Sequence, residues 1–300
     1  MARYLLLAVV GLAAQLVDGA LGMGYGVTSS SLLLVAGLTP AMASASVHLA
    51  ELGTNIASGV SHWRLGNVDW RLVATIGVPG AIGALSGATV LSRLSTEAAK
   101  PAMAAILGLL GMYILLRAVF RPPQLATARR SPHRARFLVP LGLIGGFVDA
   151  TGGGGWGPVS TTSLLSAGRT APRTVIGSVD TSEFLVSAAA SIGFVMVLGT
   201  AGIDWWIVAA LLAGGVIAAP VAAWLVSKIP AQVMGVAVGG LIVITNVRTL
   251  FASTGITADQ ATLGYGTIAV VWVGLTAWQS VSHYRSVRAA RAAEEQEYTI

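Results

Sequence analysis

Cysteine is absent from this 300-residue sequence, and charged residues make up only 10% of it. The first absence excludes disulfides, thiolate metal sites and cysteine nucleophiles. The second places the chain far below the roughly 25% charged residues of an average soluble domain. Hydrophobic residues make up 55% of the chain. No soluble fold hides so much hydrocarbon, so the composition predicts an integral membrane protein.

Other signatures of catalysis and cofactor binding are also missing from the sequence. The four histidines (48, 62, 133 and 283) show no metal-ligand spacing. We find no nucleophile–base motif and no nucleotide-binding loop, so we expect no enzymatic activity, no cofactor and no metal. The net charge of +6 comes from basic residues in short loops and tails. That placement indicates membrane topology, and we expect no nucleic-acid partner.

An internal repeat relates the two halves of the chain. The stretch VDGALGMGYGVTSSSLLL (17–34) aligns with VDATGGGGWGPVSTTSLL (148–165), and Glu51 aligns with Glu183. Residues 1–20 have the features of a signal peptide, but the repeat runs through them, which favours a place in the mature fold. The predicted organisation is an N-terminal transmembrane repeat (1–120), a basic linker (121–136), a C-terminal transmembrane repeat (137–251), an extra transmembrane helix (262–284) and a tail (285–300).

The basic loops predict how the spans cross the membrane. The arginine-rich linker and the C-terminal tail should both be cytoplasmic. An even number of crossings then separates them, so the glycine-broken segment 137–168 must enter and leave on one side. We therefore predict an all-α polytopic fold with two inverted-topology repeats. Each repeat would contain a re-entrant helical hairpin, broken into two half-length helices, and three transmembrane helices.

Glycine-rich turns interrupt the first apolar run of each half, and hydroxyl residues follow each turn. A helix that starts at such a turn exposes N–H groups and a partial positive charge, which suits an anion. Non-helical backbone at membrane depth is tolerated where protein or a water-filled cavity surrounds it. The alternative is that these glycines only permit tight helix packing. The candidate substrate-binding residues are Gly22, Gly24, Tyr25, Gly26, Thr28, Ser29, Gly152, Gly153, Gly154, Gly155, Trp156, Gly157, Ser160 and Thr161.

Acidic side chains inside the apolar runs form a second candidate set. Charges there are costly and usually functional, and a carboxyl in low dielectric can carry a proton. His48 lies one helical turn before Glu51, on the same helix face. The alternative is a structural role at the interface or between helices, which we favour for the aspartate pair 18 and 149. The candidate proton-coupling or pathway residues are Glu51, Glu183, His48, Asp180, Asp18 and Asp149.

The motif GLIGGFVDATGGGGWGPV (142–159), with its weaker copy in the first half, resembles the sulfite exporter TauE/SafE family of membrane permeases. The resemblance covers nearly the whole chain. It implies a multi-pass anion permease of the bacterial inner membrane that exports, or in some members takes up, sulfite, sulfonates and related anions. Only the glycine-turn positions are carried over from the resemblance, because the acidic residues rest on the reasoning above.

The combined prediction is a secondary transporter, with export favoured, for a small sulfur oxyanion such as sulfite, thiosulfate or an organosulfonate. The proton gradient would drive it, and the anion would sit between the two half-helix starts. An anion channel and a cation or metal transporter that uses the buried carboxylates stay open as alternatives. The expected partners are the anion and the lipid bilayer. The oligomeric state stays open, with a homodimer as a candidate.

Overall fold

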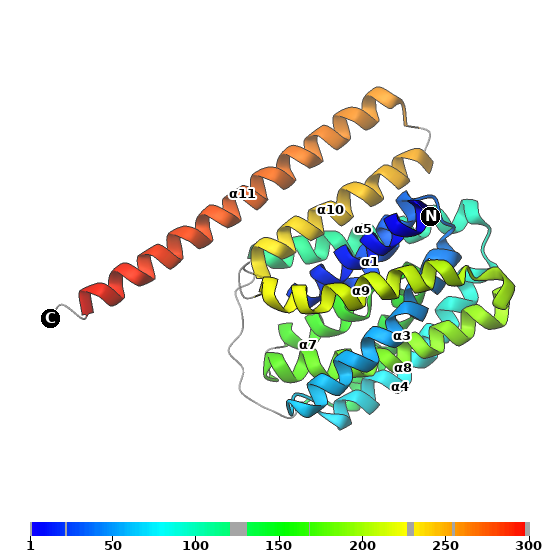
Figure 1. The fold of residues 1–300 in the computed structure, drawn as a ribbon, viewed down its shortest axis with the longest axis horizontal. Helices are drawn as coiled ribbons and strands as arrows, with labels where there is room; N and C mark the ends of the chain where they lie inside the picture. Colours follow the sequence, from blue (N-terminus) through cyan, green and yellow to red (C-terminus); the bar gives the residue numbers. More distant parts are fainter. Residues whose placement is uncertain are drawn as a thin grey trace.

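The computed structural model describes residues 2–21, 23–120, 131–167, 169–226, 231–253 and 256–297, and these residues contain helices but no strand (Figure 1). The first half holds α1 (Ala2–Leu21), α2 (Tyr25–Val35), α3 (Pro40–Arg64), α4 (Trp70–Arg93) and α5 (Thr96–Phe120). The second half holds α6 (Ala135–Gly152), the π-helix η1 (Gly157–Thr161), α7 (Thr162–Ser166), α8 (Pro172–Leu198), the short 3₁₀ turn η2 (Thr200–Gly202), α9 (Trp205–Val226) and α10 (Ala231–Ser253). The last helix is α11 (Ala258–Glu297). The predicted all-α fold is confirmed.

Six of the described helices are long and apolar enough to cross a membrane, and they lie in α4, α5, α6, α8, α10 and α11. Helix α3 has 25 residues but is not in this set. Its polar residues lower its hydropathy, and the structure buries several of them, including Ser44, His48 and Glu51. A helix with a buried polar face inside a membrane protein marks a place where charge or substrate is handled.

Glycines in the left-handed region break the first element of each half. Gly24 has φ 118°, and Gly153 and Gly154 have φ 68° and 147°, which side chains rarely tolerate. The limbs on the two sides of each break are unequal. Helices α1 and α6 have 20 and 18 residues, whereas α2 has 11 and the η1 and α7 pieces have five each. The expected pairs of half-length helices are therefore long first limbs followed by short second limbs.

The two halves interlock through backbone contacts between helices. Gly11 of α1 lies against the backbone of Leu211 in α9. A Cβ atom added to Gly11 would be only 2.3 Å from the Leu211 carbonyl oxygen. Gly142 of α6 lies in the same way against Ile76 in α4. A Cβ atom added to Gly142 would be 2.3 Å from the Ile76 carbonyl oxygen. Small residues allow this close approach in membrane helix pairs. Each broken element therefore packs on a helix of the other half.

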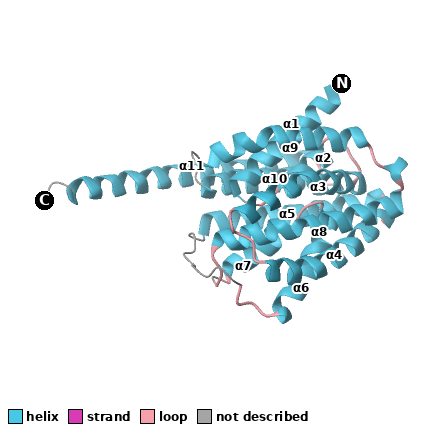
Figure 2. Ribbon diagram, turned by 60° about the horizontal axis from the view of Figure 1, so that its bottom comes forward, coloured by secondary structure: helices cyan, strands magenta, loops and turns pink. Residues whose placement is uncertain are grey.

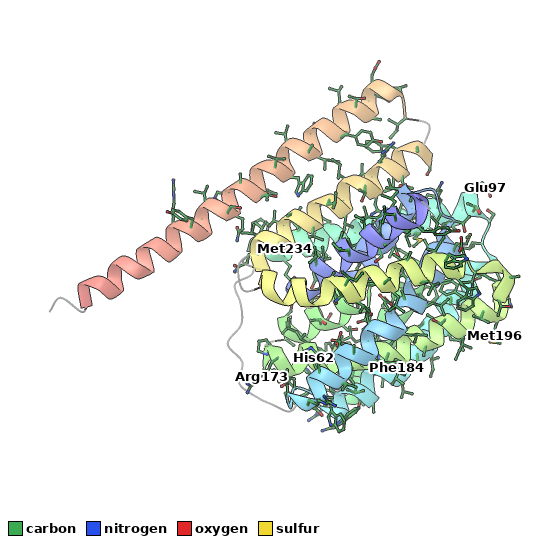
Figure 3. The ribbon with its side chains drawn as sticks, in the orientation of Figure 1. His62, Glu97, Arg173, Phe184, Met196 and Met234 are labelled. Atoms are coloured by element: carbon green, nitrogen blue, oxygen red, sulfur yellow. The ribbon has the colours of Figure 1, made fainter. Side chains whose placement is uncertain are left out.

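The loops lie at two opposite ends of the bundle. Figure 3 shows His62 and Arg173 at one end, and Glu97 and Met196 at the other. At the first end the backbone N–H of Asp69 donates to Ser178 Oγ at 2.8 Å, and the N–H of Ser131 donates to Asp69 at 2.8 Å. We call this the basic end. The described start of the predicted cytoplasmic linker, at Ser131, lies here, but the side of the membrane that this end faces stays a prediction.

Helix α11 projects from the bundle in both views and packs against α10 (Figures 1 and 2). The sequence predicts a span that ends at 284 and a separate tail, whereas the structure continues the same helix to Glu297. The residues after 284 are rich in alanine, arginine and glutamate, which favour helix. The inverted relation of the halves and the domain boundaries stay predictions. Gly22, most of the predicted linker (121–130) and residues 298–300 lie outside the described residues.

Candidate functional site

The two glycine turns, far apart in sequence, are in direct contact. A Cβ built on Gly154 would lie 2.1 Å from the Gly26 carbonyl carbon and from the Val27 nitrogen. A Cβ on Gly26 would lie 2.6 Å from the Gly154 Cα and 3.0 Å from Glu51 Oε1. The hydroxyl of Ser30 donates to the Gly153 carbonyl and fastens the contact. We call residues 24–27 and 153–156 the turn junction.

Two aspartates occupy the N–H groups at the starts of the second limbs. The Oδ1 atom of Asp149 accepts the N–H groups of Gly155 and Trp156 at 2.7 and 2.9 Å. In the first half, Asp18 Oδ1 accepts the N–H of Tyr25 at 3.3 Å. A carboxylate is well suited to a helix start because it satisfies unpaired donors and the partial positive charge. Three of the N–H groups that the sequence offers to a substrate anion are thus engaged by the protein itself.

A buried histidine links the second turn to the first half. His48 Nδ1 lies 3.0 Å from Glu51 Oε2 and 3.8 Å from Asp149 Oδ2. Ser187 on α8 donates to the same Glu51 oxygen at 3.1 Å. All four side chains are at most 2% exposed. We call His48, Glu51, Asp149 and Ser187 the carboxylate–histidine cluster.

The cluster has an apolar wall and one free nitrogen. The Phe194 ring stacks on the imidazole of His48, with centroids 6.2 Å apart and planes 18° from parallel. Nε2 of His48 and Oδ2 of Asp149 are buried and have no hydrogen-bond partner. Buried polar atoms in proteins are normally paired, so unpaired ones mark sites that bind water, protons or ligands. The cluster therefore has spare hydrogen-bonding capacity at the centre of the molecule.

The repeat mates of His48 and Glu51 do not take the same positions. Asp180 and Glu183 on α8 are only partly buried. Asp180 lies near Ser58 and His62, and its Oδ2 has no partner. Glu183 is close enough to Glu51, Asp149 and Asp18 for their charges to interact. No described residue forms a hydrogen bond to its side chain. Of the six predicted acidic or histidine residues, the structure thus brings His48, Glu51 and Asp149 together in the cluster. Asp18, Asp180 and Glu183 lie outside it.

The aromatic side chains at the matched turn positions are pinned rather than free to gate. Trp156 is fully buried, and its Nε1 donates to the Val179 carbonyl at 3.0 Å. The hydroxyl of Tyr25 donates to the Leu211 carbonyl at 3.3 Å. Both rings lie against the helices that carry their partners, so they hold the turns in place.

The hydroxyls after the turns fall into two groups. Ser29 Oγ donates to the Tyr25 carbonyl at 2.7 Å, which closes its hydrogen bonding within α2. In contrast, Thr28 Oγ1 and Ser160 Oγ are buried without a partner. Thr161 is also buried, beside Ser160 in η1. Two of the predicted hydroxyls, one from each half, are therefore available to a ligand.

Three serines in and around the site are not among the candidate residues of the sequence analysis. Ser30, Ser44 and Ser187 bond Gly153, Ala150 and Glu51, each across the interface between the halves. Ser187 lies four residues after Glu183, so helical spacing along α8 was the one available signal for it. No sequence pattern indicates that its hydroxyl meets Glu51 of α3.

Among the described residues, no group of three or more histidine, cysteine, aspartate or glutamate side chains has the geometry to hold a metal ion. The carboxylate–histidine cluster instead has the chemistry of proton transfer, since an imidazole stands between two carboxylates. This observation gives no support to the cation or metal alternative.

A polytopic helical bundle with glycine-broken helices and buried titratable groups between its halves has the features of a membrane transport protein. Comparison with known proteins gives the family. The family model for the sulfite exporter TauE/SafE matches residues 7–249, and the chain belongs to this family. The match covers most of α1 to α10 and leaves α11 outside.

One relative has a similar length and a descriptive name. The chain is 50% identical over 273 residues to the "Probable membrane transporter protein YtnM" of Bacillus subtilis (strain 168), and the alignment covers 91% of each chain. No solved structure matches this chain. The chain is therefore a multi-pass membrane protein of a transporter family.

Proposed function

We propose that this chain is a secondary transporter that carries a small sulfur oxyanion, such as sulfite, thiosulfate or an organosulfonate, together with a proton. The observation that carries the proposal is the cap that Asp149 forms on the N–H groups of Gly155 and Trp156. A carboxylate and a sulfite group both present anionic oxygens to such donors. Asp149 thus occupies the place that the substrate would take.

Substrate binding requires Asp149 to give up these hydrogen bonds. Protonation removes the negative charge of the carboxylate and weakens it as an acceptor, so the donors become available to another anion. Proton uptake and anion binding then favour each other, because linkage between two sites is reciprocal. A monoanion and a proton cross together without net charge, and their concentration gradients set the direction.

His48 supplies the proton route. Its Nδ1 is 3.0 Å from Glu51 and 3.8 Å from Asp149, so a small rotation of the ring brings it within hydrogen-bond distance of either carboxylate. Its Nε2 has no partner and is available to a water molecule or to the substrate. Glu51 and His48 therefore form the coupling pair, and Asp149 is the residue that exchanges with the anion.

The turn junction must open to admit an anion, since the backbones of Gly26 and Gly154 are in contact. We place the two broken elements in inverted orientation, so that they open toward opposite sides. In support, the start of α6 and the residues after α7 line one hollow at the basic end. The ring of Tyr4, near the start of α1, packs at a tilted angle against Trp206, which follows the loop at the opposite end. The closed contact favours a carrier over a channel.

The family description favours export from the cytoplasm across the bacterial inner membrane, and for a proton–anion symporter this direction is driven by the outward gradient of the anion. The arginines at the basic end support a cytoplasmic position for that end by the positive-inside rule. Membrane transport, and no enzymatic reaction, is the activity that we assign.

The test is sulfite and thiosulfate flux into proteoliposomes, with and without an imposed pH gradient. We expect saturable flux that follows the gradient. Flux that ignores the gradient would reject proton coupling and leave the anion site standing. Flux of neither ion, together with uptake of divalent cations, would reject the anion transporter in favour of the cation alternative.

A further inference from the structure

A hollow of about 500 Å³ opens at the basic end, well away from the turn junction. It is lined by the residues that lead into α6 and by those that follow α7, which are Pro132, His133, Arg134, Arg136, Phe137, Ala167 and Arg169. Helix α6 separates it from the second turn by 18 residues, or about 27 Å at 1.5 Å per residue. The hollow is thus a separate site from the one described above.

The charges around the hollow have one sign. Arg134, Arg136 and Arg169 are exposed, and no described carboxylate lies within ion-pairing distance of their side chains. Helix α6 begins at this point, and its N-cap residue, Arg134, makes no side-chain capping bond. The partial positive charge of the helix start therefore adds to that of the arginines.

One buried polar atom also belongs to the hollow. His133 is 8% exposed, and its Nε2 has no hydrogen-bond partner. The Phe137 ring packs against the imidazole of His133, with centroids 5.2 Å apart, and the backbone N–H of His133 donates to the Ser131 hydroxyl at 3.4 Å. Burial, and then the charge of Arg169, lower the pKa of His133 below its usual range. The neutral ring can donate one hydrogen bond, while the arginines carry the charge.

We propose that this hollow is a second binding site, for an oxyanion of the phosphate or sulfate type, held by Arg134, Arg136 and Arg169 with His133 beneath them. Guanidinium groups bind tetrahedral oxyanions through paired, charge-assisted hydrogen bonds. The oxyanion is either free in the cytoplasm or the phosphate of an anionic lipid headgroup, because the hollow lies where α6 meets the predicted membrane surface. The proposal does not depend on the transport mechanism at the turn junction.

The experiment uses the full chain with all three arginines replaced, Arg134→Gln, Arg136→Gln and Arg169→Gln. A matched control replaces three exposed arginines at the same end that do not line the hollow, Arg64→Gln, Arg71→Gln and Arg173→Gln. The probes are sodium sulfate, titrated by calorimetry in detergent, and nanodiscs with or without phosphatidylglycerol. We expect the hollow variant to bind at least one probe about tenfold more weakly, and the control to change little, since paired guanidinium bonds are lost only in the first.

The two probes separate the sources of the oxyanion. A loss confined to sulfate identifies a free oxyanion, and a loss confined to phosphatidylglycerol identifies a lipid headgroup. Equal weakening of the control variant, or unchanged binding of both probes by the hollow variant, would overturn the proposal.

A second measurement follows the histidine resonances of the protein with all its arginines in place. The chain has four histidines, so labelled imidazole resonances can be resolved and that of His133 identified from a His133→Gln sample. We expect sulfate or phosphatidylglycerol to shift the His133 resonance. No shift at His133 with either probe would overturn the proposal, whatever the transport assays give.

Discussion

The first and second glycine turns start from the same sequence pattern but make different contacts. In the second, Asp149 accepts two N–H bonds at 2.7 and 2.9 Å and reaches His48. In the first, Asp18 accepts one bond at 3.3 Å and no described histidine pairs with it. The duplication therefore supplies a shared scaffold, while the coupling chemistry that we propose lies on the second turn.

The asymmetry comes from the helices that follow the turns. Helix α3 places His48 and Glu51 at the turn junction, whereas the equivalent residues of α8 are Asp180 and Glu183, which stay partly exposed. A histidine at one position and an aspartate at its mate give the two halves different proton chemistry. Substitutions at matched positions in the two turns therefore test what each turn does.

The largest expected effect comes from glycine at the turn junction. Gly154→Ala should destabilise the protein by about 4 kcal/mol or prevent folding, because the left-handed backbone is strained and the new Cβ overlaps Gly26. Gly24→Ala should cost only about 1–2 kcal/mol, since its nearest neighbour is Val17 Cγ1 at 3.5 Å. Apparent melting temperature in detergent measures both. Equal shifts would show that the contact between the turns contributes little.

The next effect concerns the capping carboxylates. Asp149→Asn keeps the shape but cannot cycle between charged and neutral forms, so gradient-driven flux should fall about tenfold or more. Asp18→Asn should lower it only about twofold, because it caps one N–H and lies outside the cluster. Proteoliposome flux with an imposed pH gradient measures the difference. A larger loss in Asp18→Asn would move the coupling site to the first turn.

A smaller effect is expected at the matched hydroxyls. Ser160→Ala combined with Thr161→Ala should weaken anion binding about three- to tenfold without unfolding the protein, because Ser160 Oγ has no partner in the protein. Ser29→Ala should leave affinity nearly unchanged, since its hydroxyl is satisfied by the Tyr25 carbonyl. Sulfite binding measured by calorimetry compares the two. Unchanged affinity in the double variant would place the anion elsewhere.

The smallest effect concerns the pinned aromatics. Trp156→Phe removes the 3.0 Å hydrogen bond to the Val179 carbonyl and leaves a gap in a fully buried position. It should therefore lower the free energy of unfolding by about 2 kcal/mol. Tyr25→Phe removes a 3.3 Å bond without a change of volume and should cost about 0.5 kcal/mol. Melting temperatures should follow this order. The reverse order would mean that the first turn is the more tightly held.

Much of the fold could be predicted from the sequence. The low charge, the apolar runs and the repeat define an all-α membrane protein with a break in each half, since a bilayer demands long apolar helices and glycine frees the backbone. Among the described residues, the breaks fall at 23–24 and 153–156, within the predicted glycine runs. The lengths of the limbs could not be predicted, because packing of α1 on α9 and of α6 on α4 extends the first limbs.

The candidate site could be predicted as a set of residues but not as a set of contacts. Repeat alignment pairs Glu51 with Glu183 and Asp18 with Asp149, and this symmetry hides the pairing of His48 with Asp149. The free N–H groups expected at the turns are already bonded to aspartates seven residues upstream. A sequence does not show which of several suitable acceptors reaches a helix start.

The sequence by itself determined that this chain is a membrane protein, that a repeated pattern relates its halves, and that glycine interrupts a helix in each half. These follow from composition and local conformational preference, which act over a few residues. The tertiary structure alone decided that the two turns touch, that Asp149 caps one of them beside His48, and that three arginines share a hollow with His133. Such contacts depend on how segments that are separate in the sequence pack together, which no local pattern encodes.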